Sequence, residues 1–308
     1  MVDIIILATK KNISVLNISL PYIKRNIDHD KIYIVANKRD FEELRRLGVS
    51  LIDEESICEG MSFDALAEII EEISGEGKRA GWYLQQFIKM SWARYTEKEC
   101  YVVFDSDTIP LKPIDYISDE GRYYLTLKGE YHKPYFDTIE KLFLGEITKC
   151  TEKSFIAENM IIDSAVMREM ICEIERNNSL KGNKFYEKIL YAISKESILK
   201  SGFSEFETYG NYILSRYPDK VELRELRSLR EAMQIIGTAP SKDQLEWAAQ
   251  DYQIISIEGS AYKNTIITRA TSNSAFRKIC RMKSVAKTRT YIRSLYRKIK
   301  KREDYVFD

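Results

Sequence analysis

The sequence predicts an α/β fold in which helices flank a mostly parallel β-sheet. Three observations lead to this class. Apolar, β-branched runs alternate with amphipathic segments through the first third of the chain. This β-α-β-α order is typical of parallel sheets, whose strands need crossover connections. Finally, 308 residues with 44% hydrophobic content are enough to bury a large core.

The first third of the chain supplies the predicted sheet. We expect four strands and four helices to alternate along it. The helix over 39–48 has Asp40 as its predicted N-cap and Gly48 as its C′ residue. The expected strands cover 3–8, 31–37, 50–53 and 100–105, and the expected helices cover 13–26, 39–48, 62–74 and 81–96.

The middle of the chain mixes both element types. A strand over 122–128 precedes a helix over 134–145, with Pro134 at its first turn. Residues 159–177 predict a strand followed by a helix, which Asp163 or Ser164 caps. Further helices are expected over 184–194 and 204–217, and a last strand over 251–258.

These elements predict one domain over 1–262, followed by a linker and tail over 263–308. In open parallel sheets, ligands bind beyond the carboxyl ends of the strands.

Composition excludes several classes of function. Lys and Arg number 48 against 47 Asp and Glu, so the global charge gives no reason to expect a nucleic-acid partner. Five scattered Cys without CxxC spacing argue against a zinc module or a disulfide framework, and suit a reducing cytoplasm. Only His29 and His132 occur, which excludes a multi-His metal site, and His29 lies in a polar turn without an assigned role. No run predicts a signal peptide or a membrane span.

The segment 275–302 is strongly basic and carries apolar residues at roughly helical spacing, which predicts a basic amphipathic helix. Such a helix either docks on the domain with a solvated charged face or adheres to an anionic membrane surface. We favour the membrane, since the positive charge is so concentrated. Its basic residues are Arg277, Lys278, Arg281, Lys283, Lys287, Arg289, Arg293, Arg297, Lys298, Lys300, Lys301 and Arg302.

The stretch YVVFDSDTIP, residues 101–110, carries the strongest chemical signal. Asp105 and Asp107 follow a buried apolar strand directly, and like charges so close disfavour each other's ionisation. Mg²⁺ or Mn²⁺ would relieve that repulsion, because these cations prefer oxygen ligands. The alternative is an Asp-rich turn that Pro110 stiffens.

A strand that ends in Asp-x-Asp is similar to motifs of two enzyme classes. The haloacid-dehalogenase-like phosphatases carry Asp-x-Asp-x-Thr on their first strand, whereas here Ile109 takes the Thr position on about the fourth strand. The order of VVFDSDTIP, GWYLQQFIKM, AENMIID and SEFETYGNY more closely resembles GT-A (Rossmann-like) nucleotide-sugar glycosyltransferases of bacterial capsule or lipopolysaccharide synthesis. The resemblance spans about residues 1–260. It implies that the domain over 1–262 is catalytic, with a nucleotide-binding half over about 1–110 and an acceptor half over about 111–262.

The resemblance implies roles for the acidic pair and for the end of the first strand. Asp107 would bind Mn²⁺ or Mg²⁺ directly, and Asp105 would contact the ribose or bind the metal through water. Ala8, Thr9 and Lys10 would hold the nucleotide of the donor, which we expect to be UDP. A metal at the diphosphate stabilises the charge that develops as the sugar–phosphate bond breaks.

Two segments offer further site residues. Gln85 and Lys89 are four apart on the helix 81–96, so they share a face and could meet a sugar diphosphate; alternatively this is a surface helix buried through Trp82, Phe87 and Met90. At the start of the helix 204–217, Ser204 and Glu207 form a predicted capping box.

Because Glu207 is expected to cap the helix, Glu205 is the expected catalytic base of an inverting transfer, and Glu207 is the second candidate. Tyr209 is a candidate acceptor contact. Glu158 and Asn159 are candidate sugar contacts or an edge-strand polar pair, and His132 is an acceptor-site or ordinary loop residue.

The sequence therefore predicts a cytoplasmic bacterial glycosyltransferase, peripheral at the inner face of the cell membrane. It would move a sugar from a nucleotide-diphosphate donor to a surface-polysaccharide or lipid-linked glycan acceptor. A metal-dependent phosphatase using Asp105 and Asp107 is the first alternative. A non-catalytic binding protein whose basic tail is the functional part is the second.

Overall fold

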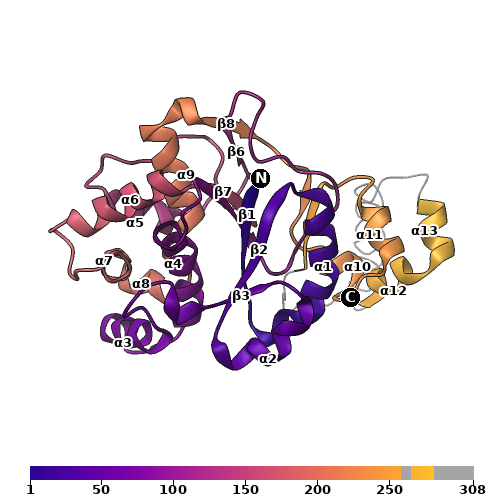
Figure 1. Ribbon diagram of the computed structural model, residues 1–308, viewed down its shortest axis with the longest axis horizontal. Coiled ribbons are helices and arrows are strands. Elements are labelled where there is room, and N and C mark those ends of the chain that lie inside the picture. The colour runs from indigo at the N-terminus through magenta and orange to yellow at the C-terminus, as the bar shows by residue number, and fades with distance from the viewer. Residues whose placement is uncertain (258–264, 281–308) are drawn as a thin grey trace, which may run out of the picture. The chain divides into compact units, whose positions relative to one another are not determined.

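The computed structural model describes residues 1–257 and 265–280. Two compact units form within it, each from several stretches of chain (Figure 1). The first unit contains Met1–Ile13, Asp28–Ser106 and Asp115–Glu225, and the second contains Ser14–Ile27, Asp107–Ile114 and the described residues from Leu226 onward. The functional division near residue 110 stays a prediction, because these units describe packing and not function.

The first unit is built on a five-stranded sheet with the strand order β3-β2-β1-β4-β7. The β1–β2, β2–β3 and β1–β4 pairs are parallel, and only β7 runs antiparallel, against β4. The predicted α/β class with a mostly parallel sheet is therefore confirmed. The strands are β1 (Val2–Leu7), β2 (His29–Ala36), β3 (Ser50–Asp53), β4 (Cys100–Asp105) and β7 (Asn159–Asp163).

Strands β1 and β4 are the buried centre of this sheet. Ile4, Ile5 and Ile6 have no exposed surface, and neither do Val102 and Val103. Such continuous apolar runs are typical of parallel strands that are covered on both faces. The last residue of β1, Leu7, pairs with the last residue of β4, Asp105, so the carboxyl ends of both strands meet at one edge.

Helix α4 (Ala80–Tyr95) packs on this sheet and against α3, α6 and α9, which gather on the same side in Figure 1. The Tyr101 hydroxyl on β4 donates a 2.7 Å hydrogen bond to the Lys89 backbone carbonyl on α4. The other helices of this unit are α2 (Phe41–Leu44), α3 (Phe63–Ser74), α5 (Lys133–Leu142), α6 (Ser164–Arg176), α7 (Phe185–Ala192), α8 (Lys195–Ile198) and α9 (Glu205–Arg216). A separate parallel pair joins β6 (Tyr123–Thr126) to β8 (Val221–Arg224).

Most predicted boundaries of this unit hold within a few residues, and two details are corrected. The single helix expected over 39–48 is instead a four-residue α2 between two 3-10 turns. Asp40 makes no capping bond with its side chain, because its carboxylate accepts the Lys10 backbone N–H at 3.0 Å. Gly48 ends the segment in the left-handed region at φ 63°, as expected for a C′ glycine. Of the two caps considered for α6, Asp163 is the one that accepts the first backbone N–H groups.

The second unit has its own apolar core around a small three-stranded sheet, β5-β10-β9. The expected last strand shortens to β10, because only three of its residues pair with β5 and β9. Trp247 and Ile255 are buried in this core. Its elements are α1 (Ile13–Asn26), β5 (Thr108–Pro110), β9 (Ser228–Leu229), α10 (Met233–Ile236), α11 (Lys242–Ala248), β10 (Ile254–Ser256), α12 (Thr265–Ser272) and α13 (Ser274–Cys280).

The first residues of the basic segment 275–302 belong to this unit. Arg277 is buried and donates to the Thr271 and Ser272 carbonyls, and Phe276 packs against the core. Residues 281–302 of the segment lie outside the described residues. Within the ranges 1–257 and 265–280, none of the helices has the length and apolar character that spanning a membrane requires.

Candidate active site

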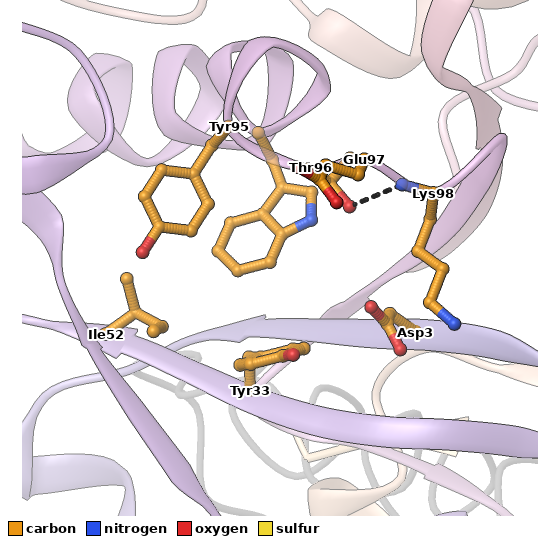
Figure 2. A pocket seen from close by; sticks show the side chains of 8 residues that line it. Asp3, Tyr33, Ile52, Tyr95, Thr96, Glu97 and Lys98 are labelled. Atoms are coloured by element: carbon orange, nitrogen blue, oxygen red, sulfur yellow. Dashed lines mark hydrogen bonds between the residues drawn. The ribbon is translucent and has the colours of Figure 1, made fainter.

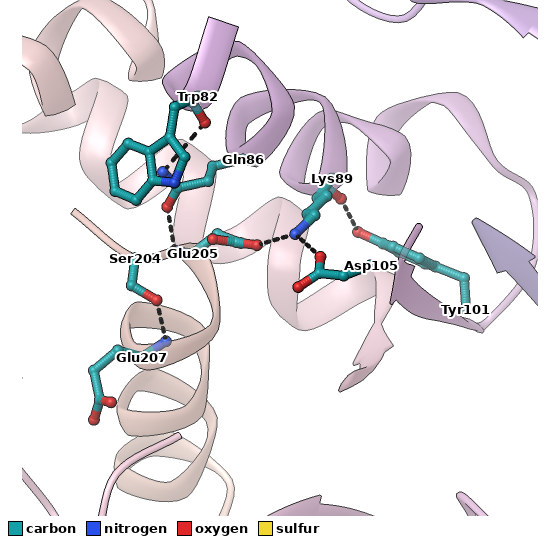
Figure 3. Close-up of polar contacts among 8 residues, drawn as sticks. All are labelled: Trp82, Gln86, Lys89, Tyr101, Asp105, Ser204, Glu205 and Glu207. Atoms are coloured by element: carbon teal, nitrogen blue, oxygen red, sulfur yellow. Dashed lines mark hydrogen bonds and ion pairs between the residues drawn. The ribbon is translucent and has the colours of Figure 1, made fainter. Parts of the chain in front are cut away.

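The carboxyl end of β4 holds a buried lysine between two carboxylates (Figure 3). Lys89 Nζ lies 2.7 Å from Asp105 Oδ1 and 2.7 Å from Glu205 Oε1. The Lys89 side chain is 9% exposed and that of Glu205 is 5% exposed, whereas 37% of the Asp105 side chain is open to solvent. We call these three residues the Lys89 trio. Since one ammonium faces two carboxylates, the trio keeps a net negative charge with its open side at Asp105.

The charge on Lys89 depends on its two partners. Burial by itself lowers the pKa of a lysine, because it penalises the ammonium form. Here the two carboxylates outweigh that penalty and hold the pKa of Lys89 above its ordinary value. The ammonium also lies 4.5 Å from the centre of the Phe206 ring, a favourable cation–π contact. Lys89 is therefore a fixed cation at this edge of the sheet.

Helix α4 positions the trio through residues spaced three apart. Tyr83 donates to the Ile198 carbonyl at 2.8 Å and accepts from the Gly202 N–H at 3.3 Å. Gln86 Oε1 accepts the Glu205 backbone N–H at 3.1 Å. One face of α4 thus fixes the loop before α9 and the first residue of α9, which places the Glu205 carboxylate against Lys89.

The start of α9 separates the two glutamates that the sequence singled out. Ser204 is the N-cap, and its hydroxyl accepts the Glu207 N–H at 3.2 Å, as predicted. The reciprocal half of the capping box is wrong: the Glu207 carboxylate accepts from the Phe155 N–H and the Asn211 side chain, both at 2.9 Å. Glu207 has no exposed surface, and this burial raises its pKa. Glu207 therefore joins α9 to the backbone of Phe155. Of the two glutamates, Glu205 is the one that pairs with Lys89.

The predicted nucleotide-binding residues lie beside Asp105. Ala8, Thr9 and Lys10 follow Leu7 directly, and Leu7 pairs with Asp105 across the two strand ends. Thr9 is exposed. The Lys10 side chain is 56% exposed, with its Nζ 3.7 Å from Glu43 and 3.9 Å from Asp40, distances typical of weak surface pairs.

Of the remaining predicted residues, Glu158 lies next to Asp105. Its backbone carbonyl accepts the Asp105 N–H at 3.0 Å, and its buried carboxylate pairs with Lys128 Nζ at 2.9 Å. Asn159 opens β7 and accepts from the Tyr116 hydroxyl at 2.7 Å. Both side chains are therefore held by protein partners at the edge of the site.

Gln85 and Tyr209 are placed differently from expectation, whereas His132 is a loop residue, one of its two expected roles. Gln85 is exposed whereas Lys89 is buried, so the two side chains do not share a binding surface as expected. The neighbouring Gln86 instead accepts the backbone N–H of Glu205. Tyr209 is fully buried, and its hydroxyl accepts the Asp163 N–H at 2.7 Å, which makes it a core residue. His132 Nε2 lies 2.6 Å from the Ser201 carbonyl, so this nitrogen carries a proton and secures the loop before α9.

Asp105 and Asp107 are the candidate ligands for a cation at the carboxyl end of β4. In the part of the chain that the structure describes, no three His, Cys, Asp or Glu side chains gather as a complete metal site. Asp107 follows Asp105 by two residues along the chain. Mg²⁺ commonly takes one or two carboxylates, with phosphate oxygens and water completing its shell. Asp105 and Asp107 belong to different compact units, so a cation shared by the two stays a prediction from the sequence.

Comparison with known proteins gives a family and a set of distant structures, of which three are described below. A family described as "Family of unknown function (DUF6492)" matches residues 6–248, more than half of the chain. A search of the curated proteins finds no match.

The three structures are each 12–14% identical in sequence to this chain. Mouse xyloside xylosyltransferase 1 matches with a TM-score of 0.45 over 83% of this chain and 97% of its own. The WbbM bifunctional glycosyltransferase matches with 0.45 over 84% of this chain, which spans about half of that protein (46%). The galactosyltransferase LgtC, solved with donor and acceptor sugar analogues, matches with 0.41 over 90% of this chain and 94% of its own. Similarity at this level assigns no activity to the chain.

Replacing Lys89 by Met should destabilise the protein at neutral pH by about 3 kcal/mol, because the buried Glu205 carboxylate then loses its cation. Urea unfolding at neutral pH measures this loss.

Lys133→Met is the matched control, because Lys133 pairs with Asp137 on an exposed helix face and such pairs contribute little. A loss of stability equal to that of this control would contradict a structural role for the trio.

Proposed function

We propose that this chain, which belongs to the DUF6492 family of unknown function, is a glycosyltransferase that uses a nucleotide-diphosphate sugar as its donor. The observation that carries the proposal is the position of Asp105. The chain builds β2 and β3 on one side of β1 and then returns to place β4 on the other side. Ligands of open α/β sheets bind at such a switch point, outside the carboxyl ends of the strands.

The strand ends at this switch point supply suitable groups for a nucleotide. Ala8 and Thr9 leave β1 there, and Asp105 leaves β4 beside them. The exposed part of the Asp105 carboxylate can accept ribose hydroxyls, while Lys89 fixes its other oxygen. We rest the choice of UDP as the preferred nucleotide on the sequence resemblance, and the choice of site on this geometry.

Asp107 and Asp105 would hold a divalent cation together with the donor diphosphate. Bound there, Mg²⁺ or Mn²⁺ would supply charge neutralisation at the departing nucleoside diphosphate. Lys89 engages Asp105 Oδ1. We therefore assign the Asp107 carboxylate as the direct ligand and Asp105 as a ribose contact or a ligand through water.

Glu205 is the proposed base for the acceptor hydroxyl, as an inverting transfer requires. It opens α9, its backbone is fixed by Gln86, and its carboxylate is oriented by Lys89. Glu207 is too deeply buried and too fully bonded for this role. The phosphatase alternative is less well supported, because its motif belongs on a first strand and Asp105 ends the fourth.

The proposed acceptor is a surface polysaccharide or a lipid-linked glycan, reached from the cytoplasmic side of the membrane. The basic segment 275–302 would bring the enzyme to the anionic lipid surface.

Titrating UDP into the protein by calorimetry tests the nucleotide site. We expect binding that strengthens with Mn²⁺ in the wild type. The Asp107→Ala variant should lose the Mn²⁺ dependence, because a carboxylate ligand is gone. Asp243→Ala, an exposed aspartate on α11, is the control and should bind as the wild type does. No binding of UDP, GDP or CMP to the wild type would refute the proposal.

Glu205→Gln should lower sugar transfer by about 10²–10⁴-fold while UDP binds within a few-fold of wild type, because a general base contributes on that order. UDP release from a panel of UDP-sugars with methyl glycosides as acceptors measures the rate.

Glu42→Gln, an exposed first-turn glutamate on α2, should leave the rate unchanged. Full activity in the Glu205 variant would remove it from the mechanism.

Neutralising Lys300, Lys301 and Arg302 to Gln should weaken sedimentation with vesicles of anionic phosphatidylglycerol by roughly 100-fold, at about 1 kcal/mol per charge. Neutral phosphatidylcholine vesicles serve as the control surface. Equal sedimentation of both proteins with anionic vesicles would argue against a membrane role for this segment.

A further inference from the structure

A pocket of about 550 Å³ lies at the opposite end of the same strands from Asp105 (Figure 2). Asp3, near the start of β1, pairs with Tyr101 near the start of β4, whereas Asp105 ends β4. The end of α4 and the loop 96–98 form the other wall. Pockets of this size hold small molecules. The Lys89 trio contributes no lining residue.

Two buried polar atoms at this pocket have no hydrogen-bond partner among the described residues: Asp3 Oδ1 and Trp92 Nε1. Asp3 is 4% exposed and Trp92 is 2% exposed. The Asp3 carboxyl accepts from the Lys31 backbone, which leaves Oδ1 without a partner. Buried polar groups are nearly always paired, so each of these atoms needs an explanation.

The two atoms are complementary. Trp92 Nε1–H can only donate, and Asp3 Oδ1 accepts. Asp3 and Trp92 both line the pocket. A hydroxyl group both accepts and donates, so hydroxyls of one ligand satisfy both atoms.

Aromatic rings form the apolar part of the pocket. The Trp92 ring lies 5.2 Å from that of Tyr33 and 5.0 Å from that of Tyr95, measured between ring centres. Tyr95 is 44% exposed at the pocket mouth. A pyranose ring suits such a wall, because its C–H faces pack on aromatic rings while its hydroxyls bond to polar atoms.

The charges at this pocket favour a neutral ligand over an organic cation. Aromatic rings and a carboxyl group would attract a cation. However, a cation without an acceptor leaves the Trp92 N–H unpaired, and the Lys98 ammonium lines the same pocket. Burial also raises the pKa of Asp3, which weakens the attraction for a cation.

We propose that this pocket is a second carbohydrate-binding site, in which Asp3 and Trp92 hold one pyranose unit of a glycan. This inference rests on the proposed function only in one respect: a glycosyltransferase would encounter glycans. The preference for a sugar follows from the polar atoms and aromatic rings of the pocket. A glycan held there would raise its effective concentration at the transfer site if its length spans both.

Ligand-detected saturation-transfer NMR on the full chain tests this site. The probes are the methyl pyranosides of glucose, galactose, mannose and rhamnose, each titrated alone. We expect at least one to bind saturably. Trp92→Phe keeps the ring but removes the N–H, so binding should weaken about five- to tenfold. Asp3→Asn should weaken it to a similar extent.

Trp247→Phe is the matched control, because Trp247 Nε1 is also buried without a partner among the described residues but lies in the core of the other unit. It should bind as the wild type does.

Three results would overturn the site. No pyranoside binds the wild type; tetramethylammonium binds the pocket and the pyranosides do not; or binding is lost in Glu205→Gln and retained in Trp92→Phe. UDP binding, measured in the same samples, separates the two proposals. Pyranoside binding without UDP binding removes only the nucleotide-dependent function, and the reverse result removes only this second site.

Discussion

A buried ammonium between two carboxylates is the interaction on which the rest of the site depends. Lys89 on α4 meets Asp105 at the end of β4 and Glu205 at the start of α9. These elements are far apart in sequence, and a lone charge at any of the buried positions would be costly. The three charges therefore stabilise the fold only when all of them are in place. The same constraint fixes two carboxylates at the edge of the sheet where a nucleotide would bind.

Helix α4 connects this edge to the opposite end of the sheet. Tyr83, Gln86 and Lys89 follow one another at three-residue spacing and hold the loop before α9 and its first residue. One turn beyond Lys89, Trp92 faces the pocket at the starts of β1 and β4. A single helix thus carries groups of the proposed transfer site and of the proposed carbohydrate pocket, with most of its length buried between them.

The fold was largely predictable because strong local signals agree with the tertiary structure. Continuous apolar runs identified β1 and β4, and Ser204 identified the start of α9. The two compact units were not predictable, since they interleave distant segments. In the site, Lys89, Asp105 and Glu205 were singled out, but their ion pairs were not. We paired Gln85 with Lys89 because they are four residues apart on a helix. Gln86, three residues from Lys89, shares a helix face with it equally well. Only packing against α9 decides between them.

Hydrogen exchange with and without UDP and Mn²⁺ tests most directly whether the Lys89 trio marks a nucleotide site. Slower exchange on ligand binding is expected in three segments: residues 8–10 after β1, residues 105–107 after β4, and the first turn of α9. Lys89→Met should abolish the protection at the third segment. Protection confined to other parts of the chain, or none in any segment, would contradict the account.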